Sequence, residues 1–462
     1  MDMRIMLGMM HELEGLRRRD RWSRQQIEVY QAGALKDLRG FAYEHSPFYR
    51  EFHRGLTDRP LNELPVLTKA MLMEHFDELV TDRAVRLAGV REYTADPVEK
   101  PPYLGRYWVN ATSGSTGHPG LFLFNRSEWT AVLASFARAH EWAGLGISLT
   151  HRMKMASVAS TTPWHMSAKV GATLRSWWMP ALRLAASEPL AQIVQQLNQF
   201  QPEMLVAYAS MSAILADEQI AGRLRISPHL VFTSSEVLTE DTRRRVQAAW
   251  RHLPFNQYAA TETGGLAAEC VQDHRLHLFE DLVIVETVDE HNHPVPSGMY
   301  GDKLLISVLF NRTQPLIRYE LSDSVLISGE TCACGRPFAV VGGIQGRIED
   351  VLRLPGAYGG EVDVHPVTFH RIMDAARVSG WQVVQKQEAI EVLLSGAPEG
   401  FDERSLAESF RAAFAALDVV VPTVRVMRIS SIPMSQAGKT PLVKSELIRP
   451  AIPPALESEI RR

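Results

Sequence analysis

The sequence predicts an α/β protein with a large N-terminal domain and a small C-terminal α+β domain. Three observations support this prediction. The chain has 462 residues, short strand-like runs alternate with amphipathic runs between Tyr107 and Val341, and the composition changes after Arg353. One hydrophobic core rarely supports a chain of this length. The alternation favours layered, largely parallel sheets covered by helices.

The individual elements follow in order along the chain. Helical periodicity interrupted by prolines predicts a helical cap in the first hundred residues. Strand-like runs at Met204–Tyr208 and Leu230–Thr233, followed by an amphipathic helix at Glu240–Trp250, predict the alternating core. Two further strands are expected at Leu282–Thr287 and Lys303–Leu309, joined by a turn-rich connection.

The predicted strand-rich region ends in the glycine-rich stretch 342–346, and a domain boundary is expected near Asp350. Residues 1–349 would then form the large domain, and residues 350–462 the small one. The small domain should follow a helix–strand–strand–helix pattern at 367–376, 381–386, 389–394 and 402–417.

The overall composition excludes several classes of function. With 49 basic and 53 acidic residues, the net charge of -4 gives no field that attracts nucleic acid, so no nucleic-acid partner is expected. No apolar run is long enough to span a membrane, and the apolar N-terminus lacks a signal-peptide cleavage site. We therefore expect a cytoplasmic protein without a membrane span, either a monomer or a homodimer.

A loop rich in hydroxyl groups and glycine carries the sharpest local signal. It follows the strand-like run Tyr107–Ala111 and consists of Thr112, Ser113, Gly114, Ser115, Thr116 and Gly117. Small residues let backbone N–H groups and hydroxyls surround phosphate oxygens closely. The loop is not a Walker A motif, because no Gly-Lys-Ser/Thr ends it. Taken alone, the same residues also fit a flexible turn.

This loop resembles the nucleotide loop of the adenylate-forming superfamily, and further motifs occur in that family's order. They are Ser235-Glu236, Tyr258-Ala259-Ala260-Thr261-Glu262, Arg318-Tyr319 with Asp323, Gly346-Arg347 leading to Asp350, and Gly438-Lys439. Other segments resemble the phenylacetate-CoA ligase branch, among them His45–Arg50, Leu64–Lys69 and Cys332–Arg336. The resemblance therefore covers nearly the whole chain.

The resemblance assigns a role to each of these residues. The loop Thr112–Gly117 would hold the β- and γ-phosphates of ATP, and Glu262 would bind Mg²⁺. Lys439 would place its charge between the acid and the α-phosphate, with Thr261 beside Glu262 in the catalytic motif. Nucleotide contacts are implied for Ser235, Glu236, Tyr258, Ala259, Asp323 and Arg347. A mobile small domain would turn about Asp350.

Two positions depart from the family pattern. Ala259 stands where the family has glycine, which would narrow or shift the acid pocket, and His118 replaces a cationic residue near the end of the phosphate loop. Aromatic and apolar residues at Trp164, Trp177, Trp178 and Met179 fall in the region that lines the acid pocket in such ligases. They favour an aromatic acid, although such residues also pack in cores.

The three cysteines suggest a metal site. Cys270 and His277 lie close in sequence, and Cys332 and Cys334 form a Cys-x-Cys pair. Three thiolates and an imidazole suit a structural tetrahedral Zn²⁺. The spacing matches no standard zinc motif, so three inert cysteines remain the alternative, and His274 is the competing histidine.

The resemblance implies a ligase that converts a carboxylic acid and ATP into an acyl-adenylate and then transfers the acyl group to CoA. The acceptor could instead be a carrier-protein thiol or an amine. An acyl-protein synthetase using its own cysteine requires a free thiol, which zinc would remove. A non-catalytic binder conflicts with the joint presence of Thr112–Gly117, Glu262, Asp323 and Lys439.

Overall fold

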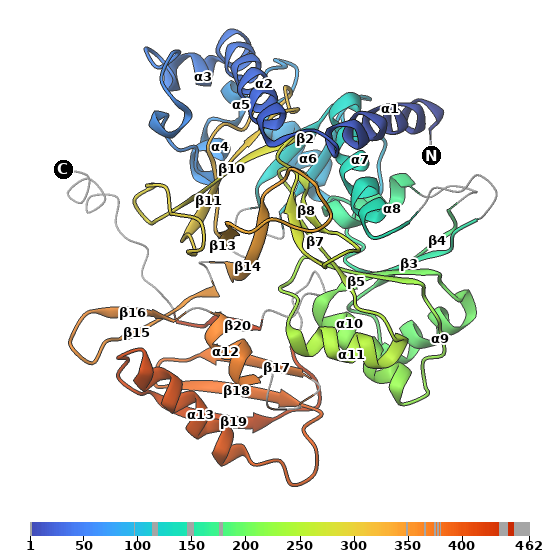
Figure 1. Ribbon diagram of the computed structural model, residues 1–462, viewed down its shortest axis with the longest axis vertical. Helices are drawn as coiled ribbons and strands as arrows, with labels where there is room; N and C mark the ends of the chain where they lie inside the picture. The colour runs from blue at the N-terminus through green and yellow to red at the C-terminus, as the bar shows by residue number, and fades with distance from the viewer. Residues whose placement is uncertain are drawn as a thin grey trace. The chain divides into compact units, whose positions relative to one another are not determined.

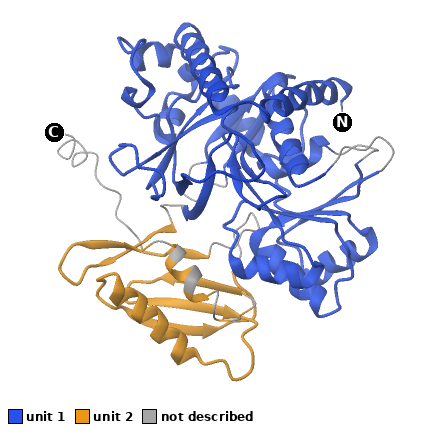
Figure 2. Ribbon diagram, in the orientation of Figure 1, with its two compact units in different colours: residues 1–348, 434–439 blue, residues 349–433, 440–462 orange. Residues whose placement is uncertain are grey.

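A computed structural model describes residues 2–96, 98–112, 119–145, 152–174, 179–347, 350–364, 366–373, 376, 378, 380–433 and 442–447 (Figure 1). The chain divides into two compact units, the larger within Met1–Ile348 and the smaller within Glu349–Pro433 and Thr440–Arg462 (Figure 2). Among the described helices, none is both long and apolar enough to cross a lipid bilayer.

The large unit begins with the expected helices. They are α1 (Met3–Arg19), α2 (Arg24–His45), α3 (Pro47–Phe52), α4 (Lys69–Glu74), α5 (Phe76–Leu79) and α6 (Leu87–Ala95), with a 3₁₀ turn η1 at Leu61–Glu63. Side-chain caps fix several starts: the Ser23 hydroxyl accepts from Gln26 N, and Thr68 Oγ1 accepts from Met71 N. Their buried apolar residues, such as Leu13 and Leu38, join the main core of the large unit.

A nine-stranded sheet is the centre of the large unit. Its spatial order is β13-β14-β9-β8-β7-β6-β5-β3-β4. Strands β4, β3, β5, β6 and β7 run parallel, whereas β7 and the strands beyond it pair antiparallel. The bounds are β3 (Met155–Ala159), β4 (Ala181–Ala185), β5 (Met204–Tyr208), β6 (Leu230–Ser234), β7 (Phe255–Ala260), β8 (Gly264–Glu269), β9 (Leu276–Leu278), β13 (Asp323–Ser328) and β14 (Val340–Arg347).

Helices cover both faces of the parallel strands, which confirms the predicted α/β layers. Along β5, Leu205 and Ala207 pack with α9, α10 and α11, whereas Met204 belongs to a cluster on the other side with Ala143 after α7. This alternation is the period of two that a strand imposes. The helices are α7 (Arg126–Trp142), α8 (Met166–Leu174), α9 (Leu190–Phe200), α10 (Ala209–Ile220) and α11 (Glu240–Trp250).

Two small sheets complete the large unit. The first is an antiparallel hairpin of β1 (Trp108–Ala111) and β2 (Leu121–Phe124). The second is antiparallel and has the order β10-β11-β12, with β10 at Val283–Val288, β11 at Lys303–Val308 and β12 at Tyr319–Leu321. Leu67 N donates to Arg318 O, and Glu320 N donates to Leu67 O, both at 3.0 Å. These bonds tie the N-terminal segment to β12.

The small unit has its own hydrophobic core and the predicted helix–strand–strand–helix pattern. These elements are α12 (Pro366–Met373), β17 (Gly380–Gln385), β18 (Ala389–Ser395) and α13 (Glu403–Ala416). The structure adds β19 (Thr423–Arg428) and β20 (Val443–Ser445) to give the order β19-β18-β17-β20, and a separate hairpin of β15 (Leu352–Pro355) and β16 (Glu361–Val364).

The glycine-rich stretch 342–346, in which the strand-rich region was expected to end, lies inside β14, the last described strand of the large unit. Crowding explains these glycines. A Cβ atom at Gly342 would lie 2.5 Å from the Leu326 side chain, and one at Gly343 would collide with the Tyr300 hydroxyl. The glycines therefore allow neighbouring side chains to approach the strand closely.

A buried cluster of charges joins α1 to the core. The Arg138 side chain on α7 is fully buried, and its guanidinium pairs with Asp20, directly after α1, and with Asp281. Asp281 also accepts from Arg19 Nε at 2.7 Å, and Asp20 accepts from Trp142 Nε1 at 2.8 Å. Each charge in this cluster thus has an opposite partner, as burial requires.

Candidate functional site

The candidate site lies at the carboxyl edge of the parallel strands. Because β3, β5, β6 and β7 run in the same direction, the residues after each strand meet along one edge of the sheet. Ligands of open α/β sheets bind in the crevice outside this edge. Of the predicted site residues, Ser235 and Glu236 follow β6, Tyr258 and Ala259 lie in the last part of β7, and the Thr261–Glu262 turn follows β7.

Ser235 and Glu236 form a constrained turn after β6. Ser235 has a φ of 66°, which a residue other than glycine seldom adopts and which often marks a functional turn. Glu236 Oε2 accepts a hydrogen bond of 2.8 Å from Ser210 N, in the first turn of α10. The carboxylate is thus held at a helix N-terminus, where the macrodipole favours negative charge.

Tyr258 and Asp323 are in direct contact. The Tyr258 hydroxyl donates a hydrogen bond of 2.9 Å to Asp323 Oδ2. A register shift between Tyr258 and Ala259 marks a bulge in β7, a feature that often redirects side chains beside active sites. Asp323 is paired with Arg347 across β13 and β14. The structure therefore brings Tyr258, Asp323 and the backbone of Arg347 together.

Glu262 lies in the tight turn between β7 and β8, and only 6% of its surface is exposed. The turn closes on Gly264, whose φ of +76° suits glycine, and a Cβ atom there would lie 2.8 Å from Val132 of α7. The next residue, Gly265, donates from its N–H to Ser135 Oγ of α7 at 3.0 Å. Helix α7 therefore fixes the turn that carries Thr261 and Glu262.

The β1–β2 hairpin pins both ends of the predicted phosphate loop. Thr112 N donates to Gly120 O at 3.0 Å, and Gly120 N donates to Thr112 Oγ1 at 2.8 Å. Thr112 is thus part of the base of the loop. The remaining loop residues, Ser113 to Gly117, lie outside the described residues, as do His118 and the predicted catalytic Lys439.

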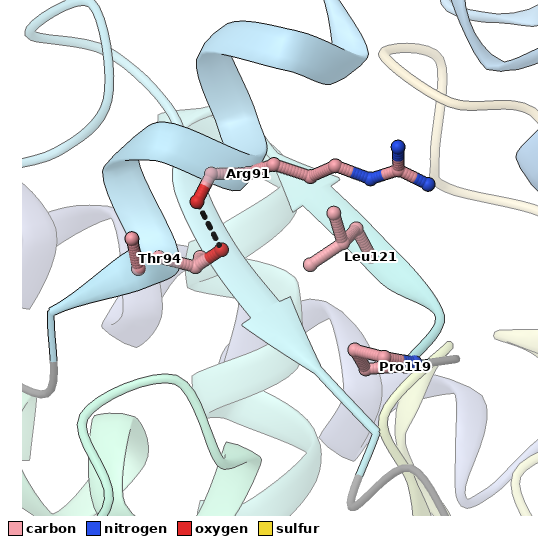
Figure 3. Close-up of a pocket in the computed structure, with 5 residues that line it drawn as sticks. Arg91, Thr94, Pro119 and Leu121 are labelled. Carbon is pink, nitrogen blue, oxygen red and sulfur yellow. Dashed lines mark hydrogen bonds between the residues drawn. The ribbon is translucent and has the colours of Figure 1, made fainter. Parts of the chain in front are cut away.

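A cavity of about 260 Å³ adjoins this loop base (Figure 3). It lies between α6 and the start of β2, and its lining includes Arg91, Thr94, Pro119 and Leu121. The Arg91 side chain extends past Leu121, and its carbonyl accepts from Thr94 Oγ1 at 3.1 Å. The exposed guanidinium of Arg91 thus brings a positive charge next to the end of the loop. The sequence motifs did not identify this residue.

Sequence motifs also missed a polar group after β3 and β5. Ser160 N donates to Tyr208 Oη at 2.9 Å, and Ser160 Oγ lies 2.6 Å from His165 Nδ1. Burial raises the pKa of Tyr208 to about 12, and the charge of Glu236 adds to the shift. Tyr208 therefore keeps its proton at neutral pH. The available signal was the position of Tyr208 at the end of the predicted strand Met204–Tyr208.

Several residues quoted with the motifs have packing roles. Arg318 is 3% exposed and pairs with Glu286, and Tyr319 is buried in the core. Trp164 and Met179 are partly buried against the same core, and Trp164 O accepts from Ala111 N at 2.8 Å. Trp177 and Trp178 lie outside the described residues. The two described members of the proposed acid-pocket set therefore contact the core.

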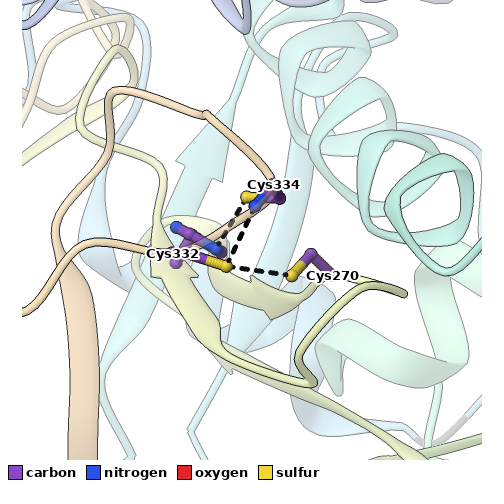
Figure 4. Close-up of side chains that lie close together, drawn as sticks. Cys270, Cys332 and Cys334 are labelled. Carbon is purple, nitrogen blue, oxygen red and sulfur yellow. Dashed lines mark hydrogen bonds between the residues drawn. The ribbon is translucent and has the colours of Figure 1, made fainter.

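The four predicted zinc ligands come together, and Figure 4 shows the three cysteines among them. Sγ of Cys270 lies 3.6 Å from Sγ of Cys332, and Sγ of Cys334 lies 3.3 Å from Nε2 of His277. All four ligand atoms lie within 4.8 Å of one another. Tetrahedral Zn²⁺ with bonds of about 2.3 Å to sulfur places its ligand atoms about 3.8 Å apart, so the residues fit this ion.

The surroundings of the cluster also suit a metal ligand set. Nδ1 of His277 lies 3.3 Å from the Phe338 carbonyl, and donation there leaves Nε2 with the lone pair that binds a metal. Burial acts to raise the pKa of Cys270, but hydrogen bonds, above all that of His277, outweigh it and bring the pKa to about 5. His274, the competing histidine, instead lies 3.4 Å from Glu269.

No family model matches the chain. The phenylacetate-coenzyme A ligase of Thermus thermophilus is 25% identical over 386 residues, which cover 79% of each chain. Protein CapK of Staphylococcus aureus is 23% identical over 311 residues, covering 64% of this chain and 62% of CapK. A crystal structure of 2-hydroxyisobutyryl-CoA ligase with 2-HIB-AMP, in the postadenylation state, has a TM-score of 0.73 at 19% identity, covering 96% of this chain and 94% of that one.

The structural match extends over both units and agrees with the predicted α/β architecture with a small C-terminal domain. The sequence match supports the branch that the motifs suggested. The chain is therefore similar in sequence to a phenylacetate-coenzyme A ligase, and it shares the fold of 2-hydroxyisobutyryl-CoA ligase.

Proposed function

We propose that this chain is an AMP-forming acid–CoA ligase that activates a carboxylic acid, most suitably an aromatic one, and transfers it to CoA. The observation that carries this proposal is the contact between Tyr258 and Asp323 at 2.9 Å, near the edge where Ser235, Glu236 and Glu262 also lie. The similarity to a phenylacetate-coenzyme A ligase supports the same reaction.

Adenylation joins two anions, so the site must neutralise charge and align them. One carboxylate oxygen of the acid attacks the α-phosphorus of ATP, and the bond from that phosphorus to the pyrophosphate oxygen breaks. The loop Thr112–Gly117 and the nearby Arg91 would hold the leaving phosphates. Glu262 would bind the Mg²⁺ that accompanies ATP, and Lys439 would offset the charge that develops at the α-phosphate.

The nucleotide would be positioned by groups at the sheet edge. Tyr258 would offer its ring to the adenine, while the Asp323 carboxylate accepts from the ribose hydroxyls. Ser235 and Glu236 would border the adenine, with Ala259 and Arg347 completing the contacts. Because Tyr258 already bonds to Asp323, the carboxylate is oriented before the nucleotide arrives.

Transfer to CoA is the second step. The thiolate sulfur attacks the acyl carbon of the adenylate, the bond from that carbon to the phosphate oxygen breaks, and AMP leaves with the electron pair. The thiol proton passes to solvent. A turn of the small domain about Asp350 would remove Lys439 from the site before this step.

We also propose that Cys270, His277, Cys332 and Cys334 hold a structural Zn²⁺. The ion would connect the segment after β8 to the segment after β13 and stabilise the fold around them. Because these are the three cysteines of the chain, zinc would leave no thiol for acyl transfer to the protein itself.

A pyrophosphate-release assay tests the proposed reaction. Aryl, arylacetic and short aliphatic acids are supplied with ATP and Mg²⁺, with and without CoA. Lys439→Ala should lower adenylation about a hundredfold or more. The matched control is Lys444→Ala, because Lys444 pairs with Glu446 at 2.7 Å and should tolerate the change.

Acid-dependent pyrophosphate release that survives Lys444→Ala but not Lys439→Ala supports adenylation. Formation of acyl-CoA then identifies the acceptor, whereas adenylation without acyl-CoA points to a carrier protein or an amine. If ATP binds but no acid releases pyrophosphate, the ligase proposal fails.

A further inference from the structure

The three cysteines of the chain meet at one place in the large unit, but they differ in exposure. Cys270 directly follows β8 and is fully buried, whereas Cys332 and Cys334 lie between β13 and β14 and are half-buried. A solute can therefore reach Cys332 and Cys334 more readily than Cys270. A cysteine that is oxidised reversibly needs this access and a second thiol close enough to react with the oxidised sulfur.

Cys270 and Cys332 form a close pair of sulfur atoms (Figure 4). Sγ of Cys332 lies 3.6 Å from Sγ of Cys270, so a disulfide of about 2.0 Å requires the two sulfurs to approach by about 1.6 Å. Sγ of Cys334 instead lies 3.3 Å from Nε2 of His277. A bond between Cys332 and Cys334 would close a tight Cys-x-Cys ring with unfavourable geometry. Cys270 is therefore the thiol best placed to react with an oxidised Cys332.

Asp273 joins the two cysteine segments without help from a metal. Its Oδ2 accepts from Ala333 N at 3.1 Å and from Cys332 Sγ at 3.4 Å, and these contacts lie at the surface. Asp273 itself belongs to the turn after Cys270, in which His274 N donates to Cys270 O at 3.0 Å. These hydrogen bonds keep Cys332 beside Cys270 whether or not a metal is bound.

We propose that Cys332 is a site of reversible oxidation by hydroperoxides and that Cys270 converts the oxidised sulfur into a disulfide. With hydrogen peroxide, the Cys332 thiolate attacks one oxygen, the sulfur–oxygen bond forms, and the oxygen–oxygen bond breaks with loss of hydroxide. The Cys270 thiolate then attacks the Cys332 sulfur, the disulfide forms, and a second hydroxide leaves. The two sulfurs lose two electrons, the peroxide gains them, and two protons from solvent complete two water molecules.

This reaction removes two ligands from the proposed zinc site. A disulfide between Cys270 and Cys332 leaves Cys334 and His277, whereas structural zinc needs four ligands. Disulfide formation would therefore release the metal, and a thiol reductant with added zinc would restore the first state. The oxidation itself needs only the two thiols, so it depends neither on the metal nor on the ligase reaction.

The disulfide would replace the metal as a link between two strands of the central sheet. Glu262 lies in the turn before β8, and Asp323 is the first residue of β13. Both strands lead into connections that carry the cysteine pair, so the bond would join their ends covalently. A crosslink between distant positions stabilises a fold mainly by restricting the unfolded chain. The oxidised protein should therefore keep these strands together after the metal has left.

Thiol counting in the full chain tests the proposal. Reduced protein is treated with hydrogen peroxide, unfolded and alkylated, and its mass is measured. Untreated protein should gain three alkyl groups, one for each cysteine, and treated protein only one, on Cys334. Fragmentation of the linked peptides should place the bond between Cys270 and Cys332, and dithiothreitol should restore three alkyl groups. A coloured chelator should detect about one zinc released per disulfide.

Serine variants identify the sulfur that reacts first. Cys334→Ser is the matched control and should still form the disulfide, so that its alkyl groups fall from two to none. Cys332→Ser should keep two. In Cys270→Ser the Cys332 sulfenic acid has no thiol to react with, so dimedone should add once per chain there and not to wild type. The thiol count of wild-type protein decides the test even where a serine variant does not fold.

Melting temperatures test the structural consequence. Oxidised, zinc-free protein should melt at a higher temperature than reduced, zinc-free protein, and Cys270→Ser should show no such difference. Three alkyl groups on wild type after peroxide, a disulfide between Cys332 and Cys334, or a dimedone adduct on Cys334 would overturn the proposal. Protein that contains no zinc but forms the disulfide would reject the zinc site alone, and pyrophosphate release is measured separately.

Discussion

The Tyr258 hydroxyl donates a hydrogen bond of 2.9 Å to Asp323 Oδ2, joining residues that are 65 positions apart. Their strands are not neighbours, since β8, β9 and β14 lie between β7 and β13 in the sheet order. The contact therefore depends on the curvature of the whole sheet, and it orients the carboxylate proposed to hold the ribose.

Removing this hydrogen bond should weaken nucleotide binding. We expect Tyr258→Phe to raise the KM for ATP about tenfold with a small change in kcat, because a hydrogen bond to a carboxylate is lost while the ring remains. Steady-state pyrophosphate release at varied ATP measures both constants. Tyr358→Phe is the control, since Tyr358 is 90% exposed. An unchanged KM in Tyr258→Phe would contradict the ribose role of Asp323.

Glu262→Gln tests the proposed magnesium ligand. The amide keeps the size of the buried side chain but loses its charge, so we expect kcat/KM for adenylation to fall about a hundredfold. Raising the Mg²⁺ concentration should recover part of the loss. A melting temperature close to wild type would show that the turn still folds, and full activity at low Mg²⁺ would assign the metal to another group.

Arg91→Ala tests whether the cavity beside the loop base contributes to phosphate binding. We expect a rise of about threefold to tenfold in the KM for ATP, because an exposed cation contributes modestly. The effect should shrink as salt is added. Arg4→Ala, an exposed arginine on α1, should leave the KM unchanged. If Arg91→Ala and Arg4→Ala have the same KM for ATP, Arg91 does not contribute to the proposed nucleotide site.

Metal analysis tests the Cys/His cluster. We expect about one zinc per chain in purified protein, and less in Cys334→Ser. Stripping the metal with a strong chelator should lower the melting temperature, because zinc-binding energy contributes to folding. Pyrophosphate release by the remaining folded protein should persist, since the ligand set is closed and structural. Zinc-free protein of unchanged stability would indicate three inert cysteines.

The buried His53 predicts a pH dependence of stability. Burial, reinforced by the charge of Arg39, lowers the pKa of His53 from 6.5 to about 4. In the unfolded chain this histidine takes up its proton at higher pH, so the folded state loses stability as the pH falls from 6.5 through 4. Once the pH is below about 4, the free energy of unfolding is about 3 kcal/mol lower than it is above pH 6.5.

Denaturant titrations at several pH values measure this effect. The stability of His53→Phe should depend less on pH than that of wild type across the window, whereas His75→Gln, at a half-buried histidine, should follow wild type. If the free energy of unfolding of His53→Phe changes with pH in the same way as that of wild type, the pKa of His53 is not lowered in the folded protein.

Regular elements were the most predictable part of the fold. Met204–Tyr208 and Glu240–Trp250 coincide with β5 and α11, because each carries an uninterrupted periodic pattern with clear ends. The sequence placed the glycines of 342–346 at the end of the strand-rich region but did not show why glycine is needed there, which is the close approach of Leu326 and Tyr300. Such crowding depends on tertiary contacts that no local pattern contains.

Residues of the candidate site could be proposed from the sequence where a motif joins several polar groups in one segment. The Tyr258–Glu262 segment and the cysteine pair at 332 and 334 are of this kind. The position of Arg91 was not predictable, because it is a lone cation on a helix and its cavity is assembled from segments distant in sequence. Only the fold shows that this cation lies beside a cavity.

The pairing of Arg138 with Asp20 has a practical consequence for work with shortened chains. A version that starts after Asp20 would remove one of the two carboxylates that neutralise the buried guanidinium and would also deprive the Trp142 indole of its acceptor. Arg138 would keep Asp281 as its partner, but the loss of a hydrogen bond to a charged group costs about 1.5–3 kcal/mol. The first helix should therefore be kept intact when tags or truncations are designed, because the stability of the large unit depends on the end of this helix.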